Sequence, residues 1–267
     1  MTTAHMPDDI SQSSRAQSDP HRAPKPDPAI AWLERLAGQF IVFDGPDGSG
    51  KSTQLAKLAQ ACHTQQIGLC QVRDPGGSGV GEHIRQVLLD HANERMSIRC
   101  EMLLYMASRA ELVDKFIKPA LNAGELVLAD RFVSSTLAYQ GNAGGLMPEE
   151  IRSVAQVATG GLWPDLTIIF DVDPATASAR MTGTSHKGKS AGPSAQMTLS
   201  LFADRMEAKG QAFHERVRAG YLALAKADPD HTVVIDATRD EQAVFDTLLD
   251  VLGQRYAAQP DQRDQPL

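Results

Sequence analysis

The chain has 267 residues, of which 42% are hydrophobic, so it is long enough to bury the core of one large domain or of two small ones. Its formal net charge of -7 excludes a general electrostatic attraction to nucleic acid or to an anionic membrane. Any phosphate ligand must therefore be bound by arginine and lysine side chains that are placed locally.

The amino-terminal segment, residues 1–37, is predicted to be a disordered tail. Residues 1 to about 28 are rich in Ser, Asp, Gln and Pro, so they cannot bury enough apolar surface to offset the entropy cost of ordering. The segment lacks the hydrophobic stretch of a signal peptide, and the chain has no apolar run of the ~18 residues that a membrane span needs. Residues 257–267 are predicted to form a second polar tail.

A phosphate-binding loop motif, G-x-x-x-x-G-K-[ST], is present as Gly45-Pro46-Asp47-Gly48-Ser49-Gly50-Lys51-Ser52. It follows an apolar strand candidate, residues 40–43, and precedes a helix candidate, residues 53–61, which is the context that the motif requires. Its backbone N–H groups would surround phosphate oxygens, Lys51 would reach the β- and γ-phosphates, and Ser52 would bind Mg²⁺. The alternative is a glycine turn that matches by accident, and the flanking strand and helix argue against it.

Strands and helices alternate along the rest of the chain. Further strands are predicted at residues 67–73, 125–130, 166–171 and 231–236, and helices at 80–90, 99–123 and 241–256, with another helix beginning at Pro174. Near-continuous apolar strands separated by helices indicate a parallel sheet that is covered on both faces. The predicted fold class is therefore α/β: a P-loop NTPase domain with three α/β/α layers and a five-stranded parallel sheet, over residues 38–256.

Charged residues follow the predicted strands at their carboxyl ends, where parallel sheets bind ligands. Asp130 could support Mg²⁺, directly or through water, although Asp also favours helix N-caps. Asp171 ends another strand and is a rival for the metal role. Arg131 carries a planar cation that is suited to clamping a phosphate.

Tyr105 and Arg109 lie four residues apart on the predicted 99–123 helix, so they share a face. An aromatic ring beside a guanidinium would suit a nucleobase. Periodicity alone, however, favours a core tyrosine with a surface arginine.

Residues 182–200 interrupt the alternation and are too small and polar to pack. Two interpretations remain open, a surface loop and a mobile lid that closes over phosphates and excludes water. The permanent cations of this segment are Lys187 and Lys189.

Five blocks of residues, 43–53, 73–78, 103–110, 130–141 and 204–207, resemble the thymidylate kinase family of nucleoside monophosphate kinases. The resemblance extends from about Gln39 to Leu252, and its fourth block, D-R-F-V-S-S-T-L-A-Y-Q-G, is close to specific for the family. It implies ATP-dependent phosphorylation of dTMP to dTDP by direct in-line transfer, in an enzyme that uses ATP and Mg²⁺. It also implies a homodimer, while the net charge and the lack of a long apolar run predict neither nucleic acid nor a membrane as a partner. The three cysteines are odd in number and form no C-x-x-C pair, which predicts free thiols in a reducing cytoplasm.

The resemblance implies a role for each residue that would contact the base and the sugar. Tyr105 would stack on the thymine, and Thr136 and Gln140 would read the base edge. Tyr139 would lie under the deoxyribose and disfavour a 2′-hydroxyl. Asp74 replaces the family's usual Glu near the 3′-hydroxyl, and because it is one methylene shorter its reach is the weakest match of these.

The resemblance also implies how phosphates are held. Arg131 and Arg85 would hold the acceptor phosphate, and Arg109 would contact either that phosphate or a base carbonyl. Three more residues complete the implied substrate site: Ser135, Asp204 and Glu207. The ATP site would comprise the whole loop, Gly45 to Ser52, with Thr53, and the metal ligands would be Ser52 and Asp130.

The catalytic cation is where the sequence departs most from the family, whose members carry an arginine either in the phosphate loop or in the lid. Residues 47–49 contain none, so the catalytic set would be Lys51, Arg131 and Asp47 with a cation from Arg180, Lys187 or Lys189. Gly144-Gly145 stands where Arg-Gly is common, which removes another possible phosphate contact.

Three alternatives to a dTMP kinase remain. A kinase for dUMP or UMP is disfavoured by Tyr139 and by the 130–141 block. A GTP-binding switch would use D-x-x-G, which residues 74–77 match, but the chain has no N-K-x-D motif. A non-catalytic nucleotide-binding protein would explain the arginine-poor lid, but Lys51, Ser52 and Asp130-Arg131 are all retained.

Overall fold

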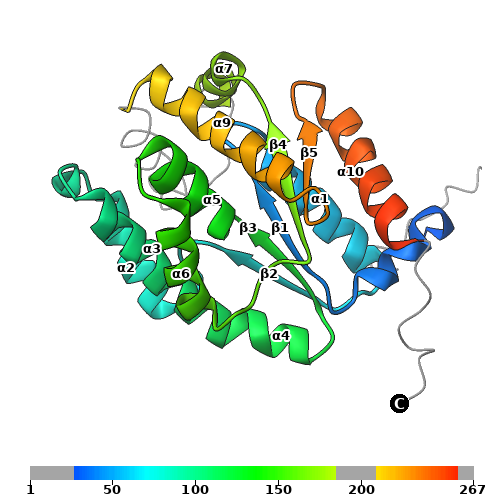
Figure 1. Cartoon of the computed structure of the whole chain (residues 1–267). Coiled ribbons are helices and arrows are strands. Elements are labelled where there is room, and N and C mark those ends of the chain that lie inside the picture. The colour runs from blue at the N-terminus through cyan, green and yellow to red at the C-terminus, as the bar shows by residue number, and fades with distance from the viewer. Residues whose placement is uncertain (1–26, 185–208, 258–267) are drawn as a thin grey trace, which may run out of the picture.

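The computed structural model of the chain describes residues 27–184 and 209–257. Within these ranges five parallel strands form one sheet in the order β2-β3-β1-β4-β5. The strands are β1 (Phe40–Asp44), β2 (Leu69–Arg73), β3 (Leu126–Asp130), β4 (Leu166–Asp171) and β5 (Thr232–Asp236). Helices lie on both sides of the sheet (Figure 1), so the predicted three-layer fold is confirmed.

The central strand β1 shows how the sheet separates two cores. Phe40 and Val42 pack into one core, and Ile41 and Phe43 pack into the other, as the alternation of side chains along a strand requires. All four side chains are fully buried. Burial on both faces explains why the strands read as continuous apolar runs in the sequence.

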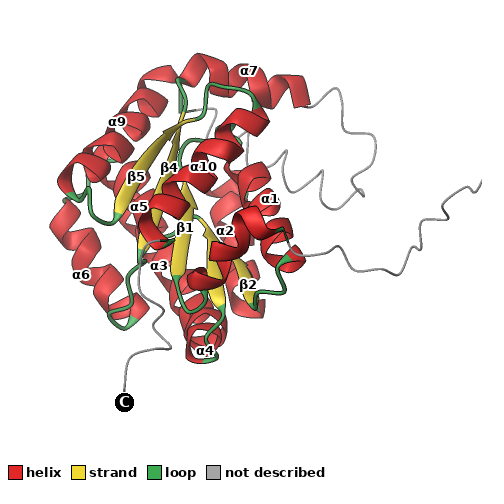
Figure 2. Cartoon of the chain, turned by 90° about the vertical axis from the view of Figure 1, so that its right-hand side faces the viewer, coloured by secondary structure: helices red, strands yellow, loops and turns green. Residues whose placement is uncertain are grey.

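One face of the sheet is covered by α1 (Lys51–Thr64), α10 (Glu241–Tyr256) and the 3-10 helix η1 (Pro28–Leu36). In Figure 2 this face is turned toward the viewer, with α1 and α10 in front of the strands. Because α1 begins at Lys51, directly after the glycine loop, the packing of this helix also fixes the position of the loop.

The opposite face carries most of the remaining helices. These elements are α3 (Ile98–Leu112), η3 (Val113–Ile117), α4 (Lys118–Asn122), α5 (Val133–Thr136), η4 (Leu137–Ala143), α6 (Pro148–Thr159) and α9 (Gln211–Ala227). Outside this layer, α2 (Gly79–Leu89) packs on α3, a short 3-10 turn η2 (His91–Asn93) follows it, and α7 (Pro174–Thr184) follows β4.

The helix predicted over residues 99–123 is present as three consecutive segments, α3, η3 and α4. The middle segment η3 has π-helical geometry. Pro119 lies in the first turn of α4, where a missing backbone N–H is tolerated. The pattern therefore predicted helical structure correctly but not the change in winding within it.

The predicted amino-terminal boundary of the domain is wrong, because residues 28–37 are not a tail. Leu33 and Leu36 of η1 are fully buried in the core with α1 and α10, and Ile30 packs against the same cluster. These side chains are three residues apart, which matches the three residues per turn of a 3-10 helix. A search for the 3.6-residue period of an α-helix does not detect apolar residues with this three-residue spacing.

The predicted lid overlaps the fold by three residues, since α7 continues to Thr184. The rest of residues 182–200 lies outside the described residues. In the ranges that the structure describes, no helix combines the length and the apolar character that crossing a bilayer demands.

Truncating Leu36 to alanine should lower the free energy of unfolding by about 2–5 kcal/mol, because it removes a fully buried side chain and leaves a cavity. Urea denaturation followed by circular dichroism measures the loss. Val157→Ala, at a side chain that is 83% exposed, is the matched control and should change stability by less than about 0.5 kcal/mol. If the two variants lost the same unfolding free energy, Leu36 would not contribute to the core, and the prediction of a tail over residues 28–37 would stand.

Candidate active site

The glycine loop has the geometry of an anion cradle. Gly45, Gly48 and Gly50 all have positive φ angles, of 133°, 77° and 85°. A Cβ atom at Gly45 would lie 2.5 Å from the carbonyl oxygen of Phe170, so β4 leaves room only for glycine there. The loop ends at the amino terminus of α1, whose first N–H groups and helix dipole favour a bound anion.

Lys51 places its ammonium group within this loop. Its Nζ atom lies 3.4 Å from the carbonyl oxygen of Pro46 and 3.6 Å from Oδ1 of Asp47, and its side chain is 8% exposed. The cation is therefore already positioned beside the backbone of the glycine loop.

Ser52 and Asp130, the two residues predicted to bind Mg²⁺, lie next to each other. The Ser52 hydroxyl donates to Oδ2 of Asp130 at 2.8 Å, although the two residues lie on α1 and β3. Asp130 does not cap a helix, because α5 begins after Phe132. A hydroxyl and a carboxylate oxygen suit Mg²⁺, which commonly takes one or two protein oxygens and completes its shell with phosphate and water.

Asp171, the rival metal ligand, is engaged elsewhere. Its two carboxylate oxygens accept hydrogen bonds from Nε and Nη2 of Arg218, both at 2.7 Å. This bidentate pair joins β4 to α9. Asp171 is therefore occupied by an arginine, whereas Asp130 lies beside Ser52 of the phosphate loop.

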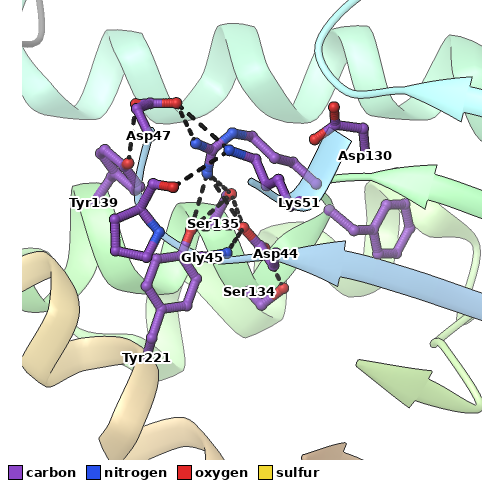
Figure 3. Close-up of polar contacts among 12 residues, drawn as sticks. Asp44, Gly45, Asp47, Lys51, Asp130, Ser134, Ser135, Tyr139 and Tyr221 are labelled. Atoms are coloured by element: carbon purple, nitrogen blue, oxygen red, sulfur yellow. Dashed lines mark hydrogen bonds and ion pairs between the residues drawn. The ribbon is translucent and has the colours of Figure 1, made fainter. Parts of the chain in front are cut away.

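A buried carboxylate, Asp44, lies directly before the glycine loop and was not among the predicted site residues. It is fully buried, and its oxygens accept from the hydroxyl groups of Ser134, Ser135 and Tyr221 at 2.6–2.7 Å. Nη1 of Arg131 donates to it at 3.2 Å. Figure 3 shows these contacts converging from β1, α5 and α9. Because a buried charge is costly unless it is hydrogen-bonded, these donors are needed to keep Asp44 in place.

Arg131 is held between two carboxylates. Besides the contact to Asp44, its Nη2 atom donates to Oδ1 of Asp47 at 2.6 Å, and its Nη1 atom donates to the Tyr221 hydroxyl at 3.0 Å. Burial alone would lower the pKa of Arg131, but Asp47 and the other acids and phenols around it raise that pKa well above its usual value. Its φ angle of 72° is rare for a non-glycine residue, and such strain gathers at functional sites.

Asp47 links this arginine to the glycine loop. Burial would raise the pKa of Asp47, but the charges of Arg131 and Lys51 outweigh that effect and hold the pKa well below its usual value. The Tyr139 hydroxyl also donates to Asp47, at 3.3 Å. The two cations and the tyrosine therefore keep Asp47 ionised at the boundary between the loop and a neighbouring pocket.

That pocket encloses about 410 Å³ of empty space, part of it open to solvent. Its lining residues come from the glycine loop, the β2–α2 loop, α3 and the segment that follows β3. They are Asp47, Asp74, Pro75, Tyr105, Arg109, Arg131, Ser135, Thr136, Tyr139 and Gln140. The structure thus brings together most of the residues that the sequence assigned to a nucleotide substrate.

Arg109 is buried, so the interpretation of this residue as a surface arginine is wrong. Its side chain is 1% exposed, and its Nε atom donates to Oδ2 of Asp74 at 2.5 Å. Nη2 donates to the carbonyl oxygen of Phe132 and to Oγ1 of Thr136. Helical periodicity missed this because the partners come from the loop after β2 and from the segment after β3.

Asp74 has one carboxylate oxygen that the described residues leave without a hydrogen bond. Burial raises the pKa of Asp74, and the Arg109 guanidinium opposes that shift. Its Oδ1 atom is buried and accepts no hydrogen bond from the part of the chain that the structure describes. A ligand hydroxyl in the pocket would satisfy that oxygen.

Two predicted phosphate contacts lie outside the pocket lining. Arg85 is buried and donates through Nη1 to the carbonyl oxygen of Pro75 at 2.8 Å, and burial lowers its pKa to about 10. Arg180 donates to the carbonyl oxygens of Ala237 and Thr238 and so holds the loop between β5 and α10. The remaining candidates, Lys187, Lys189, Asp204 and Glu207, lie outside the described residues.

Comparison with known proteins gives a consistent result. The family model described as thymidylate kinase matches residues 43–248. A thymidylate kinase from Exiguobacterium sp. is 43% identical over 220 residues, which cover 82% of this chain and 96% of that protein. One from Symbiobacterium thermophilum is 44% identical over 205 residues, covering 77% and 88%. A crystal structure of thymidylate kinase from Ehrlichia chaffeensis matches with a TM-score of 0.61 at 28% identity, covering 81% of this chain and 98% of that one.

Replacing Tyr221 by phenylalanine should lower the free energy of unfolding by about 1–3 kcal/mol, because buried Asp44 loses a donor and Arg131 loses an acceptor. Chemical denaturation of the variant measures the loss. Tyr256→Phe, which removes the same atom from another buried tyrosine outside this cluster, is the control. A loss no larger than that of the control would mean that the Tyr221 hydroxyl does not support Asp44.

Proposed function

The chain belongs to the thymidylate kinase family, and on that premise we propose that it transfers the γ-phosphoryl group of ATP to the 5′-phosphate of dTMP, giving ADP and dTDP. One observation carries the proposal. Asp47 and Arg131, which line the nucleotide pocket, are joined through Asp47 to Lys51 of the phosphate loop. A donor phosphate on the loop and an acceptor phosphate in the pocket would therefore meet at this junction.

On the donor side, the residues of the loop bind and neutralise the phosphates of ATP. Backbone N–H groups of the glycine loop and of the first turn of α1 surround the phosphate oxygens, and Lys51 neutralises negative charge on the transferred group. Ser52 and Asp130 hold Mg²⁺, which when bound supplies further neutralisation of phosphate charge.

On the acceptor side, the nucleophile is itself a phosphate. Its second pKa is about 6, so it is largely dianionic at pH 7 and needs no general base. Catalysis then rests on alignment and on neutralisation of charge between two anions. Arg131 supplies this at the junction, and Asp44, Ser135 and Tyr221 hold its guanidinium in place. Arg85 adds positive charge near the same phosphate and donates a hydrogen bond to the carbonyl oxygen of Pro75, which lines the pocket.

The base and sugar occupy the remainder of the pocket. Tyr105 stacks on the thymine, and Arg109, Thr136 and Gln140 face its polar edge. Tyr139 lies against the deoxyribose. The free oxygen of Asp74 accepts the 3′-hydroxyl, which would satisfy its missing hydrogen bond.

The catalytic cation that approaches from the lid comes from Lys187 or Lys189 in this proposal. Arg180 is less suited, since its guanidinium is committed to backbone carbonyls near α10. Asp204 and Glu207 retain the acceptor-site roles that the resemblance gives them. The GTP switch and the non-catalytic alternatives are not favoured, because the family is one of kinases.

We also propose that the protein acts as a homodimer in the cytoplasm. Val80 and Val87 of α2 and Leu103 of α3 are 44–52% exposed, and the two helices pack side by side. Such an apolar surface on adjacent helices suits a second copy of the chain. The cysteines are all free thiols, as a reducing compartment favours.

A coupled ADP-release assay with ATP and Mg²⁺ tests the activity, with dTMP, dUMP, UMP, CMP and GMP offered separately. We expect turnover mainly with dTMP. Lys51→Ala should lower kcat by about two orders of magnitude or more while the circular dichroism spectrum is unchanged. Turnover confined to another nucleotide would overturn the substrate assignment, and near-normal turnover in Lys51→Ala would overturn the role of the loop.

Sedimentation velocity tests the dimer. The wild-type chain should sediment as a dimer at micromolar concentration, and Leu103→Arg should shift it toward the monomer by placing a charge in the apolar surface. Leu222→Arg, at a side chain of α9 that is 38% exposed, is the control and should remain dimeric. A monomeric wild type, or a dimer unaffected by Leu103→Arg, would contradict this interface.

A further inference from the structure

Gln140, which lines the nucleotide pocket, has a buried acidic partner that the function described so far does not use. Its Nε2 atom donates to Oε1 of Glu101 at 2.7 Å, and both side chains are only 2% exposed. Glu101 lies on α3, and Gln140 lies on η4. The contact therefore joins two of the elements that form the pocket.

This hydrogen bond decides which way the Gln140 amide faces. A carboxylate has only acceptor oxygens, so it must receive the NH₂ group of the amide. The opposite orientation would bring two oxygen atoms within 2.7 Å of each other. With its NH₂ group bound to Glu101, Gln140 has its carbonyl oxygen left for the pocket.

The charge of Glu101 is compensated locally. The Nζ atom of Lys209 lies 3.7 Å from Oε1 of Glu101 and 4.8 Å from the centre of the Phe213 ring. Buried carboxylates persist when an opposite charge and a hydrogen bond are both present, and Glu101 has both. The carboxylate can therefore serve as a fixed acceptor for Gln140.

The pocket then presents one hydrogen-bond acceptor and one donor group to a base. Gln140 offers an acceptor, and Arg109, which lines the same pocket, carries only donors. Thymine and uracil match this pair, because their N3–H donates and their O4 accepts. Cytosine carries the reverse pattern, with an acceptor at N3 and donors on N4.

We infer that Glu101 is a positioning residue that sets base specificity, by locking the Gln140 amide so that its carbonyl oxygen faces the base. The inference rests on the proposed function, since it takes the pocket as the site of the acceptor nucleotide. It assigns to Glu101 no contact with the substrate. Its effect on the base passes through Gln140.

The test is Glu101→Gln, which keeps the size of the side chain but can donate as well as accept, so the Gln140 amide is free to turn. The two ligands compared are dTMP and 5-methyl-dCMP, which differ only at N3 and at position 4 of the base. We expect the preference for dTMP, as a ratio of kcat/KM values, to fall by roughly tenfold or more. Glu111→Gln, on the same helix and outside the pocket, should leave the ratio unchanged.

The exchange variant Glu101→Gln/Gln140→Glu separates positioning from folding. It restores the hydrogen bond with donor and acceptor exchanged, and residue 140 again presents an acceptor oxygen, so the preference should recover. An unchanged ratio in Glu101→Gln, or no recovery in the exchange variant when both are folded, would overturn the inference.

Dissociation constants from calorimetry distinguish this failure from failure of the proposed function. They report base discrimination without turnover. If wild-type protein prefers dTMP in binding but transfers no phosphate, the proposed activity fails while the role of Glu101 is still measured. If wild-type protein binds both nucleotides equally, the inference is overturned whatever the activity.

Discussion

The structure of the site depends on one buried negative charge, the carboxylate of Asp44 at the end of the central strand. Water cannot reach it, so hydrogen-bond donors from the protein must replace hydration. Those donors come from α5, from α9 and from Arg131, and their hydrogen bonds to Asp44 hold these elements close together. The guanidinium of Arg131 is thereby aimed at the glycine loop before any ligand is present. Because this cation is already in place, the site needs no rearrangement when negative charge develops on a reacting group.

The parallel sheet explains why acidic residues gather at one edge and yet differ in what they do. Asp44, Asp74, Asp130 and Asp171 each end a strand or directly follow one, and the carboxyl ends of parallel strands share an edge. Their roles differ because their partners differ. Asp44 accepts hydrogen bonds from hydroxyl groups, and Asp74 forms an ion pair with a buried arginine. Asp130 accepts a hydrogen bond from Ser52, and Asp171 forms an ion pair with an arginine from α9.

Much of the fold and of the pocket was predictable from patterns of residues close together in the chain. Apolar strands with turns between them predicted the sheet, and the residues that follow those strands predicted the ligand edge. The exceptions are informative. The segment 28–37 was missed because its apolar period is that of a 3-10 helix, and Arg109 was placed on the surface because its buried partners are distant in the chain. Tyr221 gave no signal, since 177 residues separate it from the carboxylate that it supports.

The sequence by itself determined the α/β class, the phosphate loop and the types of residue in the pocket, because these follow from local spacing and from the chemistry of single side chains. Only the tertiary structure decided which partner each acid binds, that Arg131 is locked between two carboxylates, and that the Gln140 amide donates to Glu101. Each of these depends on a hydrogen bond or an ion pair between elements that are far apart in the chain. The energy of such a contact depends on distance and burial in space, and neither can be read from residue order.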